Sequence, residues 1–446
     1  MKLKHKILEQ CERAKEAALK LATLSTDTKN FTLYELAEDI KISKNKILMA
    51  NHKDIKENRN KLSKALLKRL YLDEKKIDSM VEMIRSVARL KDPVGKILGQ
   101  IELDNGLILK KVTVPIGVIC TIFESRPDVV VQISALAIKS GNAVLLKGGS
   151  EALNTNKALV EIIRKSIKDN KGVPVDAIQL IETREEIKEI LKMDDFIDLI
   201  IPRGSNRLVR YIVKNTRIPV LGHSEGICHV YIDKDADMKK AIAIAIDAKC
   251  QYPAVCNACE TLLVHKSIAK KFLPEIVSKY LDYNVEIRGD QATMDILKDI
   301  KNIRDKLKEK KSKIKRASEK DWKTEYNDLI ISIKVVKNLD EAIVHINKYG
   351  SGHTDAIVTE NKENANKFLL FVDSSSVMWN ASTRFSDGYR YGLGAEVGIS
   401  TNKIHARGPV GLDGLVIYKY ILTGKGHIVK DYIEGKKKFK YRKIKP

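Results

Sequence analysis

The chain has 446 residues, of which 43% are hydrophobic and 31% are charged, and it carries a formal net charge of +23 at pH 7. This composition excludes a disordered chain, and the length predicts two or three domains. No apolar run approaches the roughly 20 residues that a bilayer span requires, so we expect no membrane association. The first residues lack the apolar core of a secretory signal, and the six scattered cysteines form no disulfide framework. We therefore expect a cytoplasmic protein.

The positive charge is compatible with a nucleic-acid partner, because lysines and arginines that neutralise phosphates supply most of such affinity. The lysines, however, are spread along amphipathic segments beside Glu and Asp, and only 6% of the residues are aromatic. We favour a solvated, lysine-rich surface and expect no nucleic-acid partner. The densest basic stretch, residues 436–446, is typical of a flexible extension.

The first part of the chain is predicted to be helical. Apolar residues recur at helical spacing over residues 5–90, and the first proline is Pro93, which lies in a turn sequence. Residues 97–114 then alternate between apolar and polar around Asn105-Gly106, the strongest short-range hairpin signal. We expect a protruding hairpin here that is a possible subunit contact.

After the hairpin, short apolar segments alternate with helical ones. Strands are expected at residues 116–123, 143–147, 177–181 and 196–201, with helices at 129–139, 155–168 and from 202 onward. This alternation predicts a doubly wound, mainly parallel α/β sheet, which binds ligands at the carboxyl ends of its strands. Lys147, Gly204 and Ser205 each follow a strand in a glycine-containing turn, so we expect them to line one cofactor crevice.

A second α/β segment is predicted from Gly226 to about Asn402. It is expected to contain a polar helical stretch over residues 293–320 and a strand over residues 329–336. Residues 403–430 are predicted to be a loop that leads into a terminal strand. Within the second segment, Gly392–Gly398 resembles a dinucleotide-binding fingerprint, but the spacing is one residue too long and no strand precedes it. A structural or substrate-site loop is the favoured interpretation.

Cys256 lies in a short polar turn after Pro253. If a helix starts there, its unpaired N–H groups and dipole would stabilise a thiolate. Three interpretations stay open: an inert small apolar residue, half of a Cys256–Cys259 redox or zinc motif, or a nucleophile. The histidines at 345, 353 and 405 lack metal-ligand spacing with the cysteines, so no metal is expected.

Residues 380–388 form the other dense polar stretch. Arg384 has the geometry to bind a carboxylate or phosphate with two hydrogen bonds, and Ser382 and Thr383 can donate to the same group. An ordinary polar loop with a surface arginine is an equally good interpretation from this stretch alone.

Eight long segments share one further property. They are Val114–Pro127, Lys139–Gly149, Ile201–Gly204, Val255–Thr261, Tyr349–Asp355, Asn380–Gly388, Gly392–Ser400 and His405–Gly411. Together they resemble the gamma-glutamyl phosphate reductases of the aldehyde dehydrogenase superfamily, and the resemblance runs from about residue 5 to residue 430. It implies an aldehyde dehydrogenase-like fold. The implied parts are an NADP-binding domain at 1–225 interrupted by the hairpin 97–114, a catalytic domain at 226–402, an oligomerisation element made of 403–430 with 97–114, and a basic tail at 431–446.

The resemblance also implies a reaction. It is the NADPH-dependent reduction of L-glutamyl 5-phosphate to L-glutamate 5-semialdehyde and phosphate, a step of proline biosynthesis. A homo-oligomer is implied, and an association with glutamate 5-kinase is left open.

Roles follow for individual residues by position in the family motifs. Cys256 stands where the family has its nucleophile, and Lys147, Gly204, Ser205 and Glu325 stand where the superfamily contacts the cofactor. The implied oxyanion and substrate residues are Asn257, Arg126, Asn380, Ser382, Thr383 and Arg384. Hydrolytic aldehyde dehydrogenases have a water-activating glutamate where this chain has His223, or Glu225 if the alignment shifts by two residues.

Overall fold

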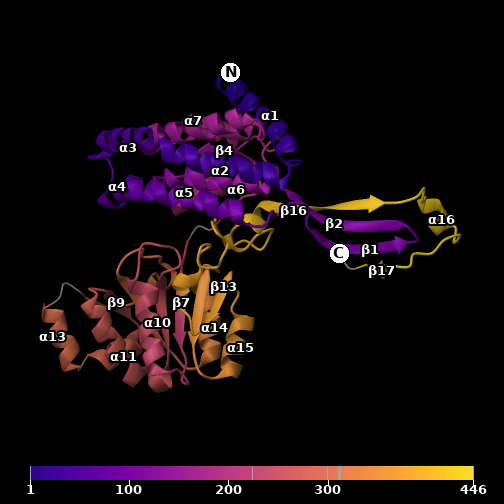
Figure 1. The fold of residues 1–446 in the computed structure, drawn as a ribbon. Helices are drawn as coiled ribbons and strands as arrows, with labels where there is room; N and C mark the ends of the chain where they lie inside the picture. The colour runs from indigo at the N-terminus through magenta and orange to yellow at the C-terminus, as the bar shows by residue number, and fades with distance from the viewer. Residues whose placement is uncertain (1, 223–224, 299, 310–312, 445–446) are drawn as a thin grey trace. The chain divides into compact units, whose positions relative to one another are not determined.

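The computed structural model describes residues 2–222, 225–298, 300–309 and 313–444. The chain divides into two compact units, drawn in Figure 1. The first unit comprises Met1–Gly222, Gly392–Gly398 and Val410–Pro446, and the second comprises His223–Tyr391 and Ile399–Pro409. Within the described ranges, no helix is long and apolar enough to cross a membrane.

The first unit begins with the helices that the apolar spacing predicted. They are α1 (Lys2–Leu21), α2 (Thr26–Ile42), α3 (Lys44–Asn58), α4 (Lys64–Leu70) and α5 (Glu74–Arg89). Side chains cap the starts of α2 and α5: Ser25 accepts from the Thr28 N–H, and Asp73 accepts from the Lys76 N–H. The prediction of a helical amino-terminal block is confirmed.

A four-stranded parallel sheet follows in this unit, in the order β5-β4-β3-β6. The strands are β3 (Val118–Phe123), β4 (Ala143–Lys147), β5 (Ile178–Leu180) and β6 (Leu199–Arg203), and the helical segments between and after them are α6 (Asp128–Ser140), η1 (Ser150–Ala152), α7 (Leu153–Asn170), η2 (Val175–Ala177), α8 (Arg184–Ile190) and α9 (Asn206–Asn215). All residues of β3 and β4 are buried, as their unbroken apolar runs predicted.

The predicted α/β class is confirmed, but the last strand of this sheet begins later than expected. β6 starts at Leu199 rather than at Phe196. Directly before it, the Asp198 carboxylate accepts a hydrogen bond of 2.8 Å from the Val118 N–H at the start of β3. The chain order reverses between β3 and β6, so the carboxyl ends of these strands and of β4 form the edge where such sheets bind ligands.

A separate antiparallel sheet in the first unit has the order β16-β2-β1-β17. It comprises β1 (Ile97–Asp104), β2 (Leu107–Pro115), β16 (Val416–Thr423) and β17 (Arg442–Lys443), and α16 (Val429–Ile433) lies between the last two strands. The predicted hairpin is confirmed, with Gly106 at a φ of +76° in its turn.

The expectation of a flexible basic tail is wrong for the described part of that segment. β17 pairs with β1, placing Arg442 opposite Glu102. Arg442 forms an ion pair with Glu102, and the Lys440 ammonium lies 3.2 Å from the Asp104 carboxylate. The basic residues of the tail therefore match acidic residues on β1, which the composition of the tail alone does not reveal.

The second unit contains a sheet whose described strands have the order β10-β9-β11-β8-β7-β12-β13, all parallel. The strands are β7 (Cys228–Ile232), β8 (Cys259–His265), β9 (Glu286–Gly289), β10 (Ile314–Arg316), β11 (Ile330–Val336), β12 (Thr354–Val358) and β13 (Ser376–Trp379). The helical segments are α10 (Met238–Cys250), α11 (Lys266–Asp282), α12 (Gln291–Leu297), α13 (Lys301–Glu309), η3 (Asp321–Lys323), α14 (Leu339–Tyr349), α15 (Lys362–Phe371) and η4 (Thr383–Phe385). Two short strands, β14 (Gly398–Ser400) and β15 (Gly408–Val410), pair with each other, and η5 (Leu412–Leu415) precedes β16.

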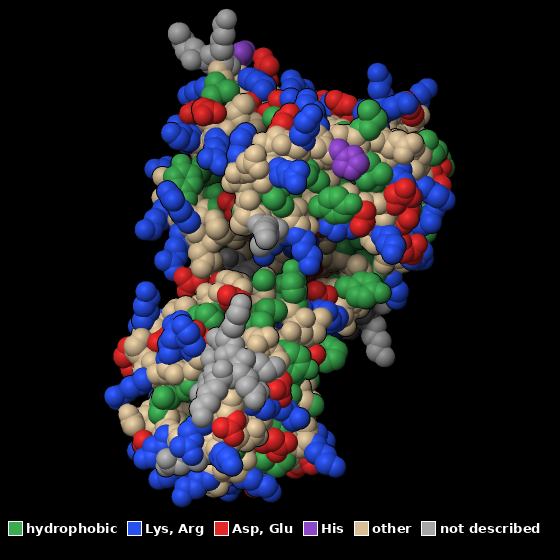
Figure 2. Space-filling view, turned by 90° about the vertical axis from the view of Figure 1, so that its left-hand side faces the viewer, with side chains coloured by type: hydrophobic (Ala, Val, Ile, Leu, Met, Phe, Trp, Pro, Cys, Tyr) green, Lys and Arg blue, Asp and Glu red, His purple; other side chains and the backbone are tan. Residues whose placement is uncertain are grey.

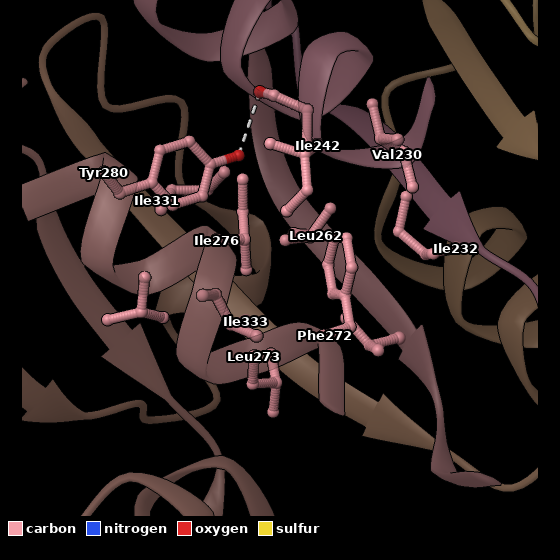
Figure 3. Close-up of a cluster of buried hydrophobic side chains, with 14 of the residues drawn as sticks. Val230, Ile232, Ile242, Leu262, Phe272, Leu273, Ile276, Tyr280, Ile331 and Ile333 are labelled. Carbon is pink, nitrogen blue, oxygen red and sulfur yellow. Dashed lines mark hydrogen bonds between the residues drawn. The ribbon is translucent and has the colours of Figure 1, made fainter. Parts of the chain in front are cut away.

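Helices cover both faces of this sheet. α10 and α11 pack on one face through Ile242, Phe272 and Ile276, as Figure 3 shows, while α14 and α15 cover the other face. The Tyr280 hydroxyl donates a 2.9 Å hydrogen bond to the Ala245 carbonyl, so the buried phenol is satisfied.

The polar helical stretch expected at 293–320 is only partly correct. It contains α12 and α13, but Ile314 begins β10, which pairs with β9. Ile314 packs against the core of the unit, and this tertiary contact overrides the polar local pattern.

On the face shown in Figure 2, Lys and Arg side chains are dispersed with Asp and Glu among them, as the charge analysis expected.

Candidate active site

Cys256 lies in the turn between α10 and β8, at the amino edge of the second unit's sheet. The helix start considered as a possibility at this cysteine does not occur, because α10 ends at Cys250 and the chain then continues into β8. No helix dipole of this turn therefore points its positive end at the sulfur, and stabilisation of a thiolate has to come from side chains.

The Cys256 turn is pressed against the start of β7. A Cβ atom on Gly226 would lie 2.1 Å from the carbonyl oxygen of Cys256 and 2.6 Å from its Cα atom. Two residues further on, the Cys228 thiol donates to the same carbonyl oxygen at 3.2 Å. Only glycine fits at position 226 without displacing the cysteine backbone.

The side chain of His353 lies against the sulfur of Cys256. Its Nε2 atom lies 3.1 Å from the Cys256 sulfur, and its Nδ1 atom lies 2.8 Å from the hydroxyl of Thr354. The imidazole is buried, whereas Cys256 is half-buried. An imidazole at this distance can accept the thiol proton, so Cys256 has the immediate surroundings of an activated nucleophile.

Cys259, the second residue of the C-x-x-C pair, lies in a different environment. It is part of the hydrophobic core, its thiol donates to the Thr261 carbonyl at 3.2 Å, and burial raises its pKa to about 12. All six cysteines are free thiols, and no group of three metal-ligating side chains occurs among the described residues.

The polar segment after β13 borders the Cys256 turn. The Asn257 side chain donates to the Ser386 carbonyl at 2.8 Å, and Arg384 Nε donates to Gln251 Oε1 at 3.0 Å. Arg384 is only 7% exposed, and burial, followed by the charge of Arg390, lowers its pKa. A buried guanidinium beside a second cation favours the binding of an anion.

Two buried polar atoms in the same segments support the presence of an anion site. Asn257 Oδ1 and Thr383 Oγ1 are buried and have no hydrogen-bond partner among the described residues. The Ser382 hydroxyl, by contrast, accepts from the Arg384 N–H at 3.3 Å and so shapes the turn. Unpaired buried polar atoms are costly, so the pair marks a place where a ligand or water completes the site.

Arg390 was not predicted from the sequence. Its Nη1 atom donates to the Arg384 carbonyl at 3.1 Å and lies 3.5 Å from the Asp387 carboxylate. Its only signal in the sequence is its position six residues after Arg384, which the helical and strand periodicities do not single out.

The structure does not bring Asn380 to Cys256. Its side chain exchanges two 3.0 Å hydrogen bonds with the backbone of Thr359, at the carboxyl end of β12. His353 precedes the same strand at its amino end, and a strand of this length spans about 16 Å. Asn380 therefore orders the far end of the sheet.

Glu325 lies in the segment before β11, the neighbour of β8. It stands at the same amino edge of the sheet as Cys256, because β8 and β11 are parallel. Two residues later, the Asn327 N–H donates to Glu260 Oε1 at 3.3 Å, which connects this segment to β8.

The remaining predicted cofactor residues belong to the first unit and meet at the carboxyl ends of its strands. Lys147 ends β4 and is buried, its ammonium donates to the Gly148 carbonyl, and burial lowers its pKa. Ser205 follows β6, and its N–H donates to Glu124 Oε2 at 2.8 Å. A Cβ atom on Gly204 would lie 2.6 Å from that same carboxylate oxygen.

These residues fit a nucleotide. A Cβ atom on Gly148 would lie 2.1 Å from Asn156 Nδ2, and one on Gly149 would lie 2.1 Å from Glu151 Oε1, so a side chain at either position would require these side-chain ends to move. A bare backbone beside a buried ammonium suits ribose and phosphate oxygens.

Arg126 is also in the first unit. It is exposed, and its guanidinium lies 3.1 Å from the Asp128 carboxylate. His223 lies outside the described residues, and Glu225 directly precedes Gly226.

The second unit has a half-buried cysteine beside a histidine, and the first unit has a buried lysine and glycine-containing turns at the carboxyl ends of its strands. This geometry can be compared with known proteins. The model of the aldehyde dehydrogenase family matches residues 4–327. The chain belongs to the aldehyde dehydrogenase family, whose members are oxidoreductases that use a nicotinamide cofactor.

Within that family, several similar proteins are gamma-glutamyl phosphate reductases. The gamma-glutamyl phosphate reductase of Acetivibrio thermocellus is 55% identical, with 98% of each chain covered. That of Pelotomaculum thermopropionicum is 55% identical, with 98% of this chain and 97% of the relative covered. A crystal structure of the Thermotoga maritima gamma-glutamyl phosphate reductase is 43% identical, covers 95% of this chain and 99% of its own, and has a TM-score of 0.89. The expected family and fold are thus confirmed.

Proposed function

We propose that this chain reduces L-glutamyl 5-phosphate to L-glutamate 5-semialdehyde, with release of phosphate and consumption of NADPH, as a step of proline biosynthesis. The 3.1 Å distance between Cys256 Sγ and His353 Nε2 is the observation that carries the chemistry. The names of relatives that are 55% identical over nearly the whole chain support the substrate.

The first step is assigned to side chains of the second unit. His353 accepts the proton of Cys256, and the thiolate attacks the acyl carbon of the substrate. We assign the Cys256 backbone N–H to the oxyanion that develops on the acyl oxygen. Phosphate then leaves with a proton from the His353 imidazolium, so a thioester on Cys256 remains and the imidazole is neutral again.

Arg384 and Arg390 are assigned to the phosphate of the substrate. Two guanidinium groups match the charge of a phosphate dianion better than that of a single carboxylate. Asn257, which is held by Ser386, and the hydroxyls of Ser382 and Thr383 complete this side of the site. Arg126 remains a candidate donor to the substrate.

The cofactor is assigned to Lys147, Gly204 and Ser205 of the first unit and to Glu325 of the second. When bound, the nicotinamide supplies the hydride that converts the acyl group into the aldehyde. Cys256 is released as a thiolate, and a proton taken up from solvent, which the His353 imidazole is placed to pass on, restores the thiol. NADPH is the proposed form of the cofactor.

We further propose roles for the segments of the chain. The cofactor-binding domain is residues 1–225 without the hairpin 97–114, the catalytic domain is 226–402, and residues 403–430 with 97–114 form the oligomerisation element. Exposed apolar side chains on β16, among them Tyr420 and Leu422, support a homo-oligomer. Association with glutamate 5-kinase and a cytoplasmic location complete the proposal.

The reverse reaction tests this function. With glutamate semialdehyde and NADP, the wild-type chain is expected to form NADPH only when inorganic phosphate is added, and Cys256→Ser is expected to form none. NADPH formation without phosphate would instead indicate an ordinary aldehyde dehydrogenase that releases the free acid.

A further inference from the structure

The second unit contains a fully buried ion pair that the proposed chemistry does not use. The Lys249 ammonium lies 2.7 Å from Glu260 Oε2, and both side chains are 0% exposed. Burying two charges costs several kcal/mol of desolvation, and apolar replacements of similar size are often equally stable. The pair is thus poorly explained as a source of stability.

The two residues enclose the Cys256 turn. Lys249 lies in the last turn of α10, and Glu260 is the second residue of β8, so the ion pair joins the two ends of the segment that carries the nucleophile. The ion pair therefore limits how far the two ends of that segment can move apart.

Glu260 also reaches the segment that carries Glu325. Its second carboxylate oxygen, Oε1, accepts the Asn327 N–H at 3.3 Å. Asn327 has a φ of +55°, the left-handed conformation that bends the chain two residues after Glu325. One carboxylate oxygen therefore contacts Lys249, and the other accepts a hydrogen bond from this bend.

Lys249 contacts the same segment through Tyr326. The ammonium lies 6.0 Å from the centre of the Tyr326 ring, and the Arg288 guanidinium lies 5.0 Å from it. The Tyr326 hydroxyl is bonded to Asp321 at 2.9 Å and to Ser332 at 2.7 Å. These contacts fix the positions of Tyr326 and Asn327, the two residues directly after Glu325.

We propose that Lys249 and Glu260 are positioning residues that fix the segment carrying Glu325 relative to the Cys256 turn. In this way they set the affinity of the enzyme for the cofactor. This inference rests on the assignment of Glu325 to the cofactor made above. It extends that assignment to two residues that touch neither substrate nor cofactor.

Two double variants isolate the hydrogen bond to Asn327. Both Lys249→Met/Glu260→Gln and Lys249→Met/Glu260→Met remove the buried charges together, which avoids leaving one of them unpaired. Gln and Met have similar size, but only Gln offers an oxygen to the Asn327 N–H. The difference between the two variants therefore reports the bond rather than the packing.

The expected result is a split between two measurements. The KM for NADPH should be about fivefold higher in the Met variant than in the Gln variant, the effect of one lost neutral hydrogen bond. The rate at which iodoacetamide alkylates Cys256 should be equal in the two, because that rate depends on His353. Equal KM values, or an alkylation rate that falls with the rise in KM, would overturn the inference.

Glu325→Gln separates this inference from the proposed function. A raised KM for NADPH in Glu325→Gln, together with equal KM values in the two double variants, would overturn the positioning role alone. An unchanged KM in Glu325→Gln would remove Glu325 from the cofactor site and the positioning role with it, while phosphate-dependent turnover would still test the reaction.

Discussion

The Nε2 atom of His353 lies 3.1 Å from the sulfur of Cys256, although the two residues are 97 positions apart in the sequence. Cys256 precedes β8 and His353 precedes β12, and the strand between them in the sheet is β7. The two side chains meet at the amino end of β7, and the absence of a side chain on Gly226 lets the Cys256 backbone pack against this end of the strand. The sheet order, and not the local sequence, creates the pair.

His353→Ala is expected to lower kcat/KM by roughly 100- to 10,000-fold, the usual contribution of a general base. It should also slow the alkylation of Cys256 by iodoacetamide at neutral pH, because the imidazole is no longer 3.1 Å from the sulfur to accept the thiol proton. The exposed His52 of α3 supplies a control, and His52→Ala should behave as wild type in both measurements. Unchanged alkylation and turnover in His353→Ala would remove the imidazole from the mechanism.

Gly226→Ala tests the close approach of β7 to the nucleophile. The new methyl group would lie within 2.6 Å of two backbone atoms of Cys256, so the turn has to shift. We expect a loss of turnover of at least tenfold in a protein that remains folded, since displacement of reacting atoms by about 1 Å can cost 100-fold. Gly99→Ala in β1 is the matched control, because nothing lies within 4 Å of its added Cβ atom. Wild-type turnover of Gly226→Ala would show that the turn tolerates displacement.

Arg384→Ala is expected to raise the KM for phosphate in the reverse reaction by roughly 10- to 150-fold, the value of a hydrogen bond to a charged group. The effect on kcat should be smaller, because the proton transfer belongs to His353. Arg304→Ala removes an exposed arginine of α13 and should leave both constants unchanged. A KM for phosphate that does not change in Arg384→Ala would place this guanidinium outside the anion site.

The burial of His345 predicts that the free energy of unfolding decreases in acid. Burial, followed by the charges of His229, Lys334 and Lys348, lowers its pKa from 6.5 to about 2. Below pH 6.5 the unfolded chain binds a proton here that the folded chain excludes, so the free energy of unfolding falls as the pH falls. This contribution has a limiting slope of about 1.4 kcal/mol per pH unit.

His345→Phe should therefore flatten the loss of stability between pH 6 and pH 4. Both imidazole nitrogens lack hydrogen-bond partners among the described residues, and the ring packs 4.6 Å from Tyr349 and 5.5 Å from Trp322, so phenylalanine preserves the contacts. Denaturant unfolding at several pH values measures the slope, and the exposed His52→Phe serves as control. A slope that matches wild type in His345→Phe would contradict this source of acid sensitivity.

Much of the first unit could be predicted from the sequence because its signals are local. The Asn105-Gly106 turn, the apolar spacing of α1 to α5 and the unbroken apolar runs of β3 and β4 each depend on neighbouring residues. The turn around Cys256 left a nucleophile as one of three interpretations, and the resemblance to a family selected it among them.

The parts that could not be predicted depend on contacts between distant residues. His353 was noted only for its lack of metal-ligand spacing, and it reaches Cys256 through the β8-β7-β12 order, which no local periodicity encodes. Its position between Gly352 and Thr354, just before an apolar run, was the available signal. The tail and β10 were mispredicted for the same reason, since each pairs with a strand remote in sequence.

The central claim is that the glutamyl group is carried on Cys256. Wild-type enzyme can be mixed with L-glutamyl 5-phosphate, generated in place by glutamate 5-kinase and ATP, in the absence of NADPH, and the peptide that contains Cys256 analysed by mass spectrometry. We predict a glutamyl adduct on Cys256 that disappears when NADPH is added and that never forms in Cys256→Ser. Continued turnover on addition of NADPH, with no adduct detected before it, would contradict the account.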